Sequence, residues 1–264
     1  MIEKLSCEFS KGLSSVERYD VIGCCINRAN IKSAVEEVLS RVSSGDGGYV
    51  CFTNVHCAVM ANKDLQYRKI LNESFMTLPD GKPLYWVARS RGLADVGHTP
   101  GPDFLPALLA VNHDPPLRHF FYGSRPEVLS KLVNNLQARY PGINIVGTHS
   151  PPFRRLSEKE MRHELDEIRR ARPDIIWVGL GAPKQEQWMA EYWHSLKPAV
   201  LMGVGAAFDF HAGVIRRAPR LFTHIGMEWA YRLASEPRRL WRRYLVTNSL
   251  FLCYLITSKK KKNI

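Results

Sequence analysis

The sequence lacks the short motifs that mark the commonest nucleotide-binding and hydrolase sites. It has no GxGxxG dinucleotide fingerprint, no Walker GxxxxGK[ST] loop and no GxSxG nucleophile elbow. It also has no DxD pair for a divalent cation, and no His, Asp and Glu cluster with metal-ligand spacing. We therefore expect neither a metal nor a cofactor, and the absence of the elbow weakens a hydrolase interpretation.

The sequence also lacks a CxxC motif and an apolar run long enough to span a membrane. The six cysteines form no CxxC pair and show no zinc-like spacing with histidine, which predicts buried thiols without structural disulfides. The N-terminal residues have no apolar core of a signal peptide, so we expect a cytosolic protein. The apolar stretch 244–257 is shorter than the roughly 20 residues that span a bilayer and contains polar residues, so it should lie on a membrane rather than cross it.

What the chain does have is a strongly basic tail. Residues 216–264 hold 12 Lys and Arg against two acids, so they carry +10 of the formal net charge of +12. Large apolar and aromatic side chains alternate with these cations, which suits an anionic and apolar surface such as a membrane or a lipid phosphate. Nucleic-acid binding and a plain solvated helical tail are the alternatives.

The remaining sequence alternates short apolar runs with longer amphipathic segments. Such alternation predicts parallel strands, right-handed crossovers and a layered α/β domain of Rossmann-like type with a mainly parallel sheet. The strands are expected at 19–25, 48–52, 75–78, 119–122, 143–147, 174–180 and 200–204. The helices are expected at 31–42, 56–71, 82–91, 103–111, 127–139, 158–171 and 183–196.

Ligands of such sheets sit beyond the carboxyl ends of the strands. The loops after Phe52, Leu78, Tyr122, Leu180 and Val204 are therefore the expected places for chemistry. In the Pro-Asp-Gly turn after Leu78, Asp80 is either an ordinary turn residue or a general base acting on a hydroxyl.

Two glycine-rich strand ends are candidate nucleotide sites. Gly181 and Pro183 lead into a helix whose free N–H groups suit a phosphate, although a plain turn is an equal alternative. Gly205 is followed by Asp209, which is either a ligand of ribose hydroxyls or a helix cap. His211 stands alone, which favours a structural role over that of a ligand or a base.

Together these segments resemble the WecG/TagA/CpsF family of bacterial glycosyltransferases, from about Asp20 to Tyr244. The resemblance is carried by FTNVHCAVMANKD, LPDGKPLYWVARSRG, GPDFLP, FFYGSRPEVL, VGLGAPKQEQW, GVGAAFDFHAG and RRAPRLFTHIGMEWAYRLASEPRRLWRRY, in family order. It implies an inverting, metal-independent transfer of a sugar from a UDP-sugar to a polyprenyl-diphosphate-linked saccharide during synthesis of surface polysaccharide or teichoic-acid-type polymers. It also implies a peripheral enzyme on the cytoplasmic face of the cell membrane, and homo-oligomers are possible.

The resemblance also assigns residues. It implies that Asp80 is the catalytic base, that Asn54 and Gln185 belong to the pocket, and that Asp209 lies on the nucleotide side. It further implies a C-terminal appendage that closes the site and brings Arg232, Arg239 and Arg242 to the acceptor diphosphate. We accordingly divide the chain into a catalytic domain, 1–213, and a membrane-binding appendage, 214–264.

Two positions depart from the family pattern. Phe52 stands where relatives often carry Thr, with Thr53 displaced by one residue, and His98 stands where many carry Arg. Both differences are consistent with a different donor sugar. The alternative to an enzyme is a non-enzymatic nucleotide-binding or nucleic-acid-binding α/β module that uses the same basic tail.

Overall fold

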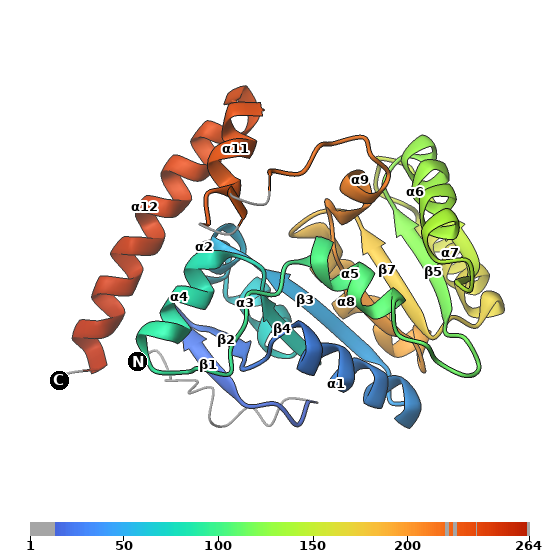
Figure 1. The fold of residues 1–264 in the computed structure, drawn as a ribbon, viewed down its shortest axis with the longest axis horizontal. Helices are drawn as coiled ribbons and strands as arrows, with labels where there is room; N and C mark the ends of the chain where they lie inside the picture. Colours follow the sequence, from blue (N-terminus) through green and yellow to red (C-terminus); the bar gives the residue numbers. More distant parts are fainter. Residues whose placement is uncertain (1–13, 220–221, 224–225, 236, 263–264) are drawn as a thin grey trace.

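The chain folds around a single large parallel sheet (Figure 1). The computed structural model describes residues 14–219, 222–223, 226–235 and 237–262, without the side chains of 232, 235, 239, 243 and 259–262. Six strands pair in the order β4-β3-β8-β7-β5-β6, all parallel. They are β3 (Gly48–Thr53), β4 (Met76–Pro79), β5 (Arg118–Gly123), β6 (Asn144–His149), β7 (Ile175–Gly179) and β8 (Val200–Gly203). This confirms the predicted layered α/β class.

Helices cover both faces of the sheet. The helical segments are α1 (Ile31–Ser44), α2 (Val55–Lys63), α3 (Leu65–Asn72), α4 (Lys82–Ser90), α5 (Gly101–Leu109), α6 (Pro126–Arg139), α7 (Glu158–Ala171), α8 (Lys184–Tyr192), the 3-10 turn η1 (Trp193–Leu196), α9 (Ala207–His211), α11 (Glu228–Ser235) and α12 (Pro237–Lys262). Alternate residues of β3 enter different cores: Tyr49 and Cys51 pack with α2, α3 and α8, whereas Val50 and Phe52 pack with α1, α5 and α6. Fully buried apolar strands are the expected result of covering both faces.

The first predicted strand, 19–25, is wrong as a single strand. It forms an antiparallel hairpin of β1 (Arg18–Val21) and β2 (Cys24–Asn27) outside the main sheet. Ile22 and Gly23 both take positive φ at the turn, and the Asp20 carboxylate accepts a 3.0 Å hydrogen bond from the Gly23 N–H. Two central residues with positive φ match the twist of a tight hairpin, but isoleucine rarely signals such a turn.

Two further predictions need correction. The helix expected at 56–71 is two helices, because Asp64 is extended and its side chain caps α3 by accepting from the Gln66 and Tyr67 N–H groups. Cys24, Cys51 and Cys57 are buried free thiols as predicted, but Cys25 is disulfide-bonded. Sequence spacing does not reveal which segment of the fold approaches a given cysteine closely enough to bond.

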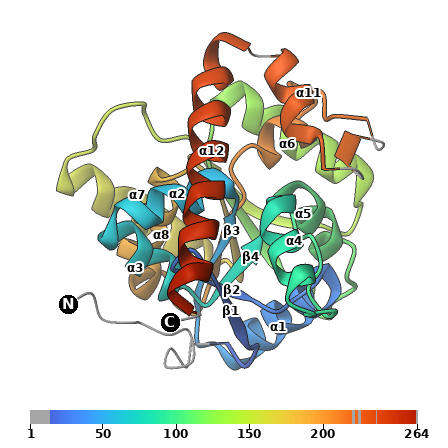
Figure 2. The ribbon, with the colours of Figure 1, turned by 90° about the vertical axis from the view of Figure 1, so that its left-hand side faces the viewer.

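The last long helix packs along α2 (Figure 2). Phe251 of α12 is buried in the core that contains residues of α2, and Leu240 and Thr247 are also buried, whereas Leu245 and Leu252 are exposed. Within the described residues, no helix is long and apolar enough to cross a membrane.

Candidate functional site

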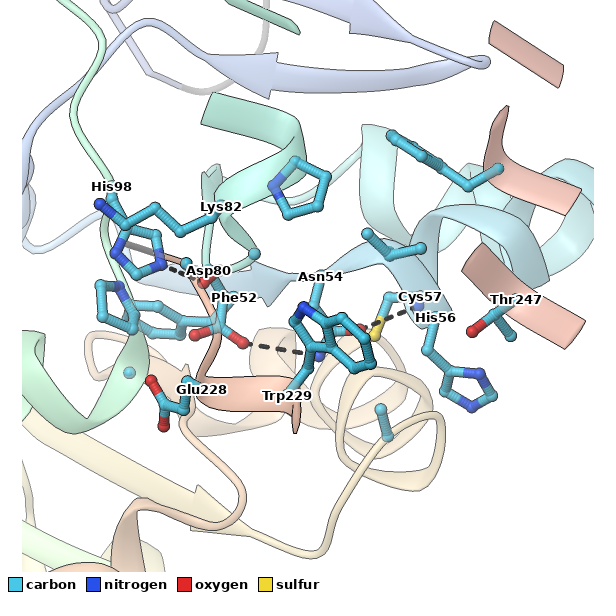
Figure 3. Close-up of a pocket in the computed structure, with 18 of the residues that line it drawn as sticks. Phe52, Asn54, His56, Cys57, Asp80, Lys82, His98, Glu228, Trp229 and Thr247 are labelled. Atoms are coloured by element: carbon cyan, nitrogen blue, oxygen red, sulfur yellow. Dashed lines mark hydrogen bonds between the residues drawn. The ribbon is translucent and has the colours of Figure 1, made fainter. Parts of the chain in front are cut away.

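A cavity of about 770 Å³ opens at the carboxyl edge of the sheet. The segments that follow β3, β4, β7 and β8 line it, and α11 and α12 form its far wall. Figure 3 shows side chains from these separate elements converging on one space. The loop after β5 does not line the cavity, contrary to expectation. Strand β7 lies between β5 and β8, and the Ser124 N–H donates to the carbonyl of Gly179 at the end of β7.

Asp80 and Asn54 meet because their strands are neighbours. In the parallel pair of β3 and β4, Thr53 lies opposite Pro79, and the Asp80 N–H donates to the Thr53 carbonyl at 2.9 Å. The Asn54 amide nitrogen then lies 3.5 Å from the Asp80 carboxylate (Figure 3). The two side chains therefore face the cavity as a hydrogen-bonded pair.

The cap of α2 fixes the direction of the Asn54 amide. Its side-chain oxygen accepts from the Cys57 N–H at 3.2 Å, as an N-cap residue does. The NH₂ group is thereby left to point at Asp80. Gly81 permits the close approach, since a Cβ there would stand 3.2 Å from the Asn54 Cα.

His98 contacts the backbone of the turn that contains Asp80. Its Nε2 lies 2.6 Å from the backbone oxygen of Asp80. Burial lowers the pKa of His98 to about 4, although the contact with the Asp80 carbonyl acts in the opposite direction. A neutral imidazole must carry its hydrogen on Nε2 to make this bond, so His98 stabilises the turn and supplies no positive charge near pH 7.

Gln185 is tied into the floor of the cavity. Its side-chain NH₂ donates to the Gly203 carbonyl at 2.7 Å and to the Glu186 carboxylate at 2.8 Å, while its oxygen accepts from the Gly181 N–H at 3.1 Å. The side chain is only 4 % exposed. Gln185 thus clamps the glycine-rich ends of β7 and β8 to each other.

Glu186 is the buried partner of this clamp. Its residue surface is 1 % exposed, and burial raises the pKa of its carboxyl to about 7 despite the hydrogen bond from Gln185. Within the described residues, its second oxygen has no hydrogen-bond partner. The group is therefore costly to ionise inside the fold.

The structure brings together some of the sequence-predicted site residues and separates others. Asn54, Asp80, His98, Gly181, Gln185 and Gly205 all line the cavity. Thr53, Pro183 and Asp209 do not. Thr53 is fully buried, and the Asp209 backbone carbonyl accepts from the Val214 and Ile215 N–H groups where α9 ends.

Of the three predicted tail arginines, the structure describes the side chain of Arg242. Arg242 is exposed, does not line the cavity, and places its guanidinium 5.3 Å from the centre of the Trp241 indole ring. The side chains of Arg232 and Arg239 lie outside the described residues. Their assignment to a diphosphate stays a prediction.

Sequence reasoning missed several cavity residues. Lys82, Trp86, Glu228 and Trp229 all line the space near Asp80 (Figure 3 labels three of them). Lys82 follows Asp80 by two residues, so its position in the sequence was enough to predict a cation near the candidate base. The other three required knowledge of how α4 and α11 face each other.

Ion pairs link Arg217 to α5 and to α11. Arg217 forms a two-pronged pair with Asp103 of α5, one prong measuring 2.9 Å, and its Nε lies 3.9 Å from the Glu228 carboxylate. The hydrogen bond with Asp103 raises the pKa of Arg217. Because Glu228 lines the cavity, this contact connects α5 to the wall formed by α11.

Comparisons with known proteins show which family the chain belongs to. The chain is 33 % identical over 219 residues to an N-acetylglucosaminyldiphosphoundecaprenol N-acetyl-beta-D-mannosaminyltransferase of Bacillus subtilis, covering 82 % of each chain. A protein of the same name from Bacillus spizizenii is 32 % identical over 75 % of each chain, and one from Staphylococcus aureus is 24 % identical over 94 % of this chain and 96 % of its own. Residues 19–264 match the glycosyl transferase WecG/TagA/CpsF family, so the chain is an enzyme of this glycosyltransferase family.

Proposed function

We propose that this protein transfers a sugar from a UDP-sugar to a polyprenyl-diphosphate-linked saccharide, with inversion at the anomeric carbon and without a metal. The observation that carries the proposal is the hydrogen-bonded pair of Asp80 and Asn54 on the wall of a cavity that also receives the glycine-rich ends of β7 and β8. The names of the relatives support N-acetylmannosamine as the first donor to test and a GlcNAc-diphosphate lipid as the first acceptor.

Asp80 is the proposed base. Its carboxylate takes the proton from the acceptor hydroxyl while that oxygen attacks the anomeric carbon, and the bond from this carbon to UDP breaks. The proton ends on Asp80, and the bonding electrons leave with the diphosphate. The Asn54 amide keeps the carboxylate in place, because its own orientation is fixed by the cap of α2.

The leaving diphosphate needs positive charge. Lys82 lines the cavity two residues from Asp80, and its ammonium group can stabilise the charge that develops on the leaving diphosphate. We propose that Arg232, Arg239 and Arg242 add guanidinium groups when the acceptor is bound, since each can fork onto phosphate oxygens.

We further propose that residues 214–264 act as an appendage that binds the cytoplasmic membrane surface. Exposed apolar side chains of α12 alternate with exposed Arg238 and Arg242, a composition that suits an anionic lipid surface. This placement would bring the cavity to a lipid-linked acceptor.

The test is transfer by the full-length protein from a panel of UDP-sugars to a polyprenyl-diphosphate-GlcNAc acceptor, with wild type and Asp80→Asn side by side. We expect one sugar to transfer and Asp80→Asn to lose at least about 10²-fold in rate, since it removes the proton acceptor. Equal rates for the two proteins would contradict the role of Asp80. Binding of UDP or nucleic acid by both, without transfer of any sugar, would favour the non-enzymatic binding module instead.

A further inference from the structure

The cavity lining contains two kinds of residue. Glycines, Asp80, Asn54 and Gln185 form the polar part. Helices α2, α4, α11 and α12 contribute apolar side chains, and we call this part of the lining the apolar end; it includes Val55, Trp86, Trp229, Phe251, Leu252, Leu255 and Ile256, together with Val87. A UDP-sugar and a saccharide offer apolar walls only a uracil ring and the C–H faces of sugar rings, whereas a lipid-linked acceptor also carries a hydrocarbon chain.

The apolar end is continuous with the outside of α12. Trp241, Leu245, Leu252 and Ile256 recur at helical spacing and form one exposed stripe, which we call the outer stripe. Leu252 and Ile256 are each 60 % exposed, yet both also line the cavity. The outer stripe and the cavity therefore share two side chains.

The neighbouring face of α12 points inward. Tyr244, Asn248 and Leu255 recur at the same helical spacing, are half-buried and line the cavity. Phe251 is 3 % exposed and anchors this face in the core formed with α2. The helix thus presents one face to solvent and the adjacent face to the cavity, with Leu252 and Ile256 between them.

We propose that the apolar end of the cavity is a subsite for the isoprenoid chain of the acceptor, entered from the membrane past Leu252 and Ile256. The inference rests on the proposed function and deepens it. An isoprenoid is the one part of a lipid-linked saccharide that gains by leaving water for such walls. With its first units held there, the diphosphate would lie between Lys82 and the tail, and the sugar would reach Asp80.

The experiment compares two soluble acceptors, GlcNAc-diphosphate carrying a farnesyl chain and GlcNAc-diphosphate carrying a methyl group, without vesicles. For the wild type we expect a KM at least about tenfold lower for the farnesyl acceptor, because only that chain can fill the apolar end. Leu255→Ser and Val87→Ser, from facing helices, should each raise the KM for the farnesyl acceptor about fivefold to tenfold and leave the methyl acceptor unaffected.

Val246→Ser is the matched control. Val246 lies on α12 and is exposed, but it belongs neither to the cavity lining nor to the outer stripe. It should leave both KM values unchanged, and thermal unfolding of all variants reports whether they fold.

The outcomes separate the two proposals. If the wild type transfers to both acceptors with equal KM, or if Leu255→Ser and Val87→Ser raise both KM values alike, the isoprenoid subsite is wrong while the transferase stands. If the wild type transfers to no acceptor but still binds UDP, the proposed reaction fails and the subsite fails with it.

Discussion

Asn54 shows how one side chain can serve the fold and the reaction together. Its oxygen caps α2, and its nitrogen faces Asp80. The two requirements fix both atoms of the amide, so neither aspartate nor alanine can satisfy both. This division lets a substitution separate the structural role from the chemical one.

Asn54→Asp should retain the cap while placing a second carboxylate against Asp80. A like charge at this distance raises the pKa of the Asp80 carboxyl, by about one unit or more. Since the base must be deprotonated to act, the acid limb of the pH–rate profile should move to higher pH by the same amount. Thermal unfolding should change little, because aspartate is as good an N-cap as asparagine.

The control is Asn54→Ala, which removes both contacts. It should cost roughly 1 kcal/mol of stability through the lost cap and should move the acid limb upward by less than Asn54→Asp does, because it removes a hydrogen-bond donor to the Asp80 carboxylate without adding a like charge. An unmoved acid limb in Asn54→Asp would mean that the Asn54 side chain does not face Asp80 during turnover.

At the scale of elements, the central feature is the clamp of Gln185 and Glu186, which joins α8 to the ends of β7 and β8. Both side chains lie in the interior, so the protonation state of the Glu186 carboxyl is coupled to folding. Glu186 has a pKa near 7 in the folded protein, against an ordinary value of 4.5. Between these values the folded state binds more protons than the unfolded state does.

Glu186→Gln should therefore change the pH dependence of stability. The wild type loses stability as pH rises from about 4.5 to about 7, by a contribution of about 3 kcal/mol, because the unfolded chain ionises this carboxyl while the folded protein keeps it protonated. The amide cannot ionise, yet it keeps an oxygen for the Gln185 NH₂. The variant should thus gain stability over the wild type as pH rises through this range.

The measurement is urea unfolding of both proteins at intervals from pH 4.5 to 7.5, taken as the difference between them. The difference is needed because His98 and His119, whose pKa values burial lowers to about 4, stabilise the fold as pH rises in the same window. A difference that stays constant with pH would show that Glu186 ionises as easily as an exposed glutamate.

The sequence predicted those elements whose signals are local. Continuous apolar runs identified β7 and β8, and strand ends placed Asp80 and Gln185 on one edge of the sheet. The order of strands is not local, which is why the loop after β5 was wrongly expected at the site. The direction of the Gln185 amide was also unreadable, since its partners are a glycine N–H and a glycine carbonyl from two different strand ends.

The cavity wall formed by α12 could be predicted only in part from the sequence. Composition identified the basic and apolar tail, but contact with α2, about 180 residues earlier in the chain, is a property of the fold. The same holds for the pair of Arg217 and Asp103. Such pairings cannot be predicted from the sequence alone, because the residues around one partner do not indicate which distant segment it will contact.

On the scale of the whole molecule, charge and apolar surface gather on the C-terminal helices. Replacing Arg238 and Arg242 together by Gln should weaken binding to vesicles of anionic lipid about tenfold to thirtyfold, since each cation near such a surface contributes about 1 kcal/mol. Added salt should reduce wild-type binding and narrow the gap between the two proteins. Vesicle co-sedimentation across a salt series checks both.

The matched control is Arg162→Gln, because Arg162 is exposed on α7, away from the C-terminal helices. It should bind vesicles as the wild type does. Equal loss from Arg162→Gln and from the double variant would point to net charge rather than to a membrane-binding face.

The contact between α2 and α12 can form only after both helices have been synthesised. The ribosome makes α2 well before α12, so at 5–20 residues per second the two are separated by an interval on the order of ten seconds or more. Through that interval the α2 surface that receives Phe251 has no partner from α12. A nascent chain can thus contain all six strands of the main sheet while its cavity still lacks the wall that α12 forms.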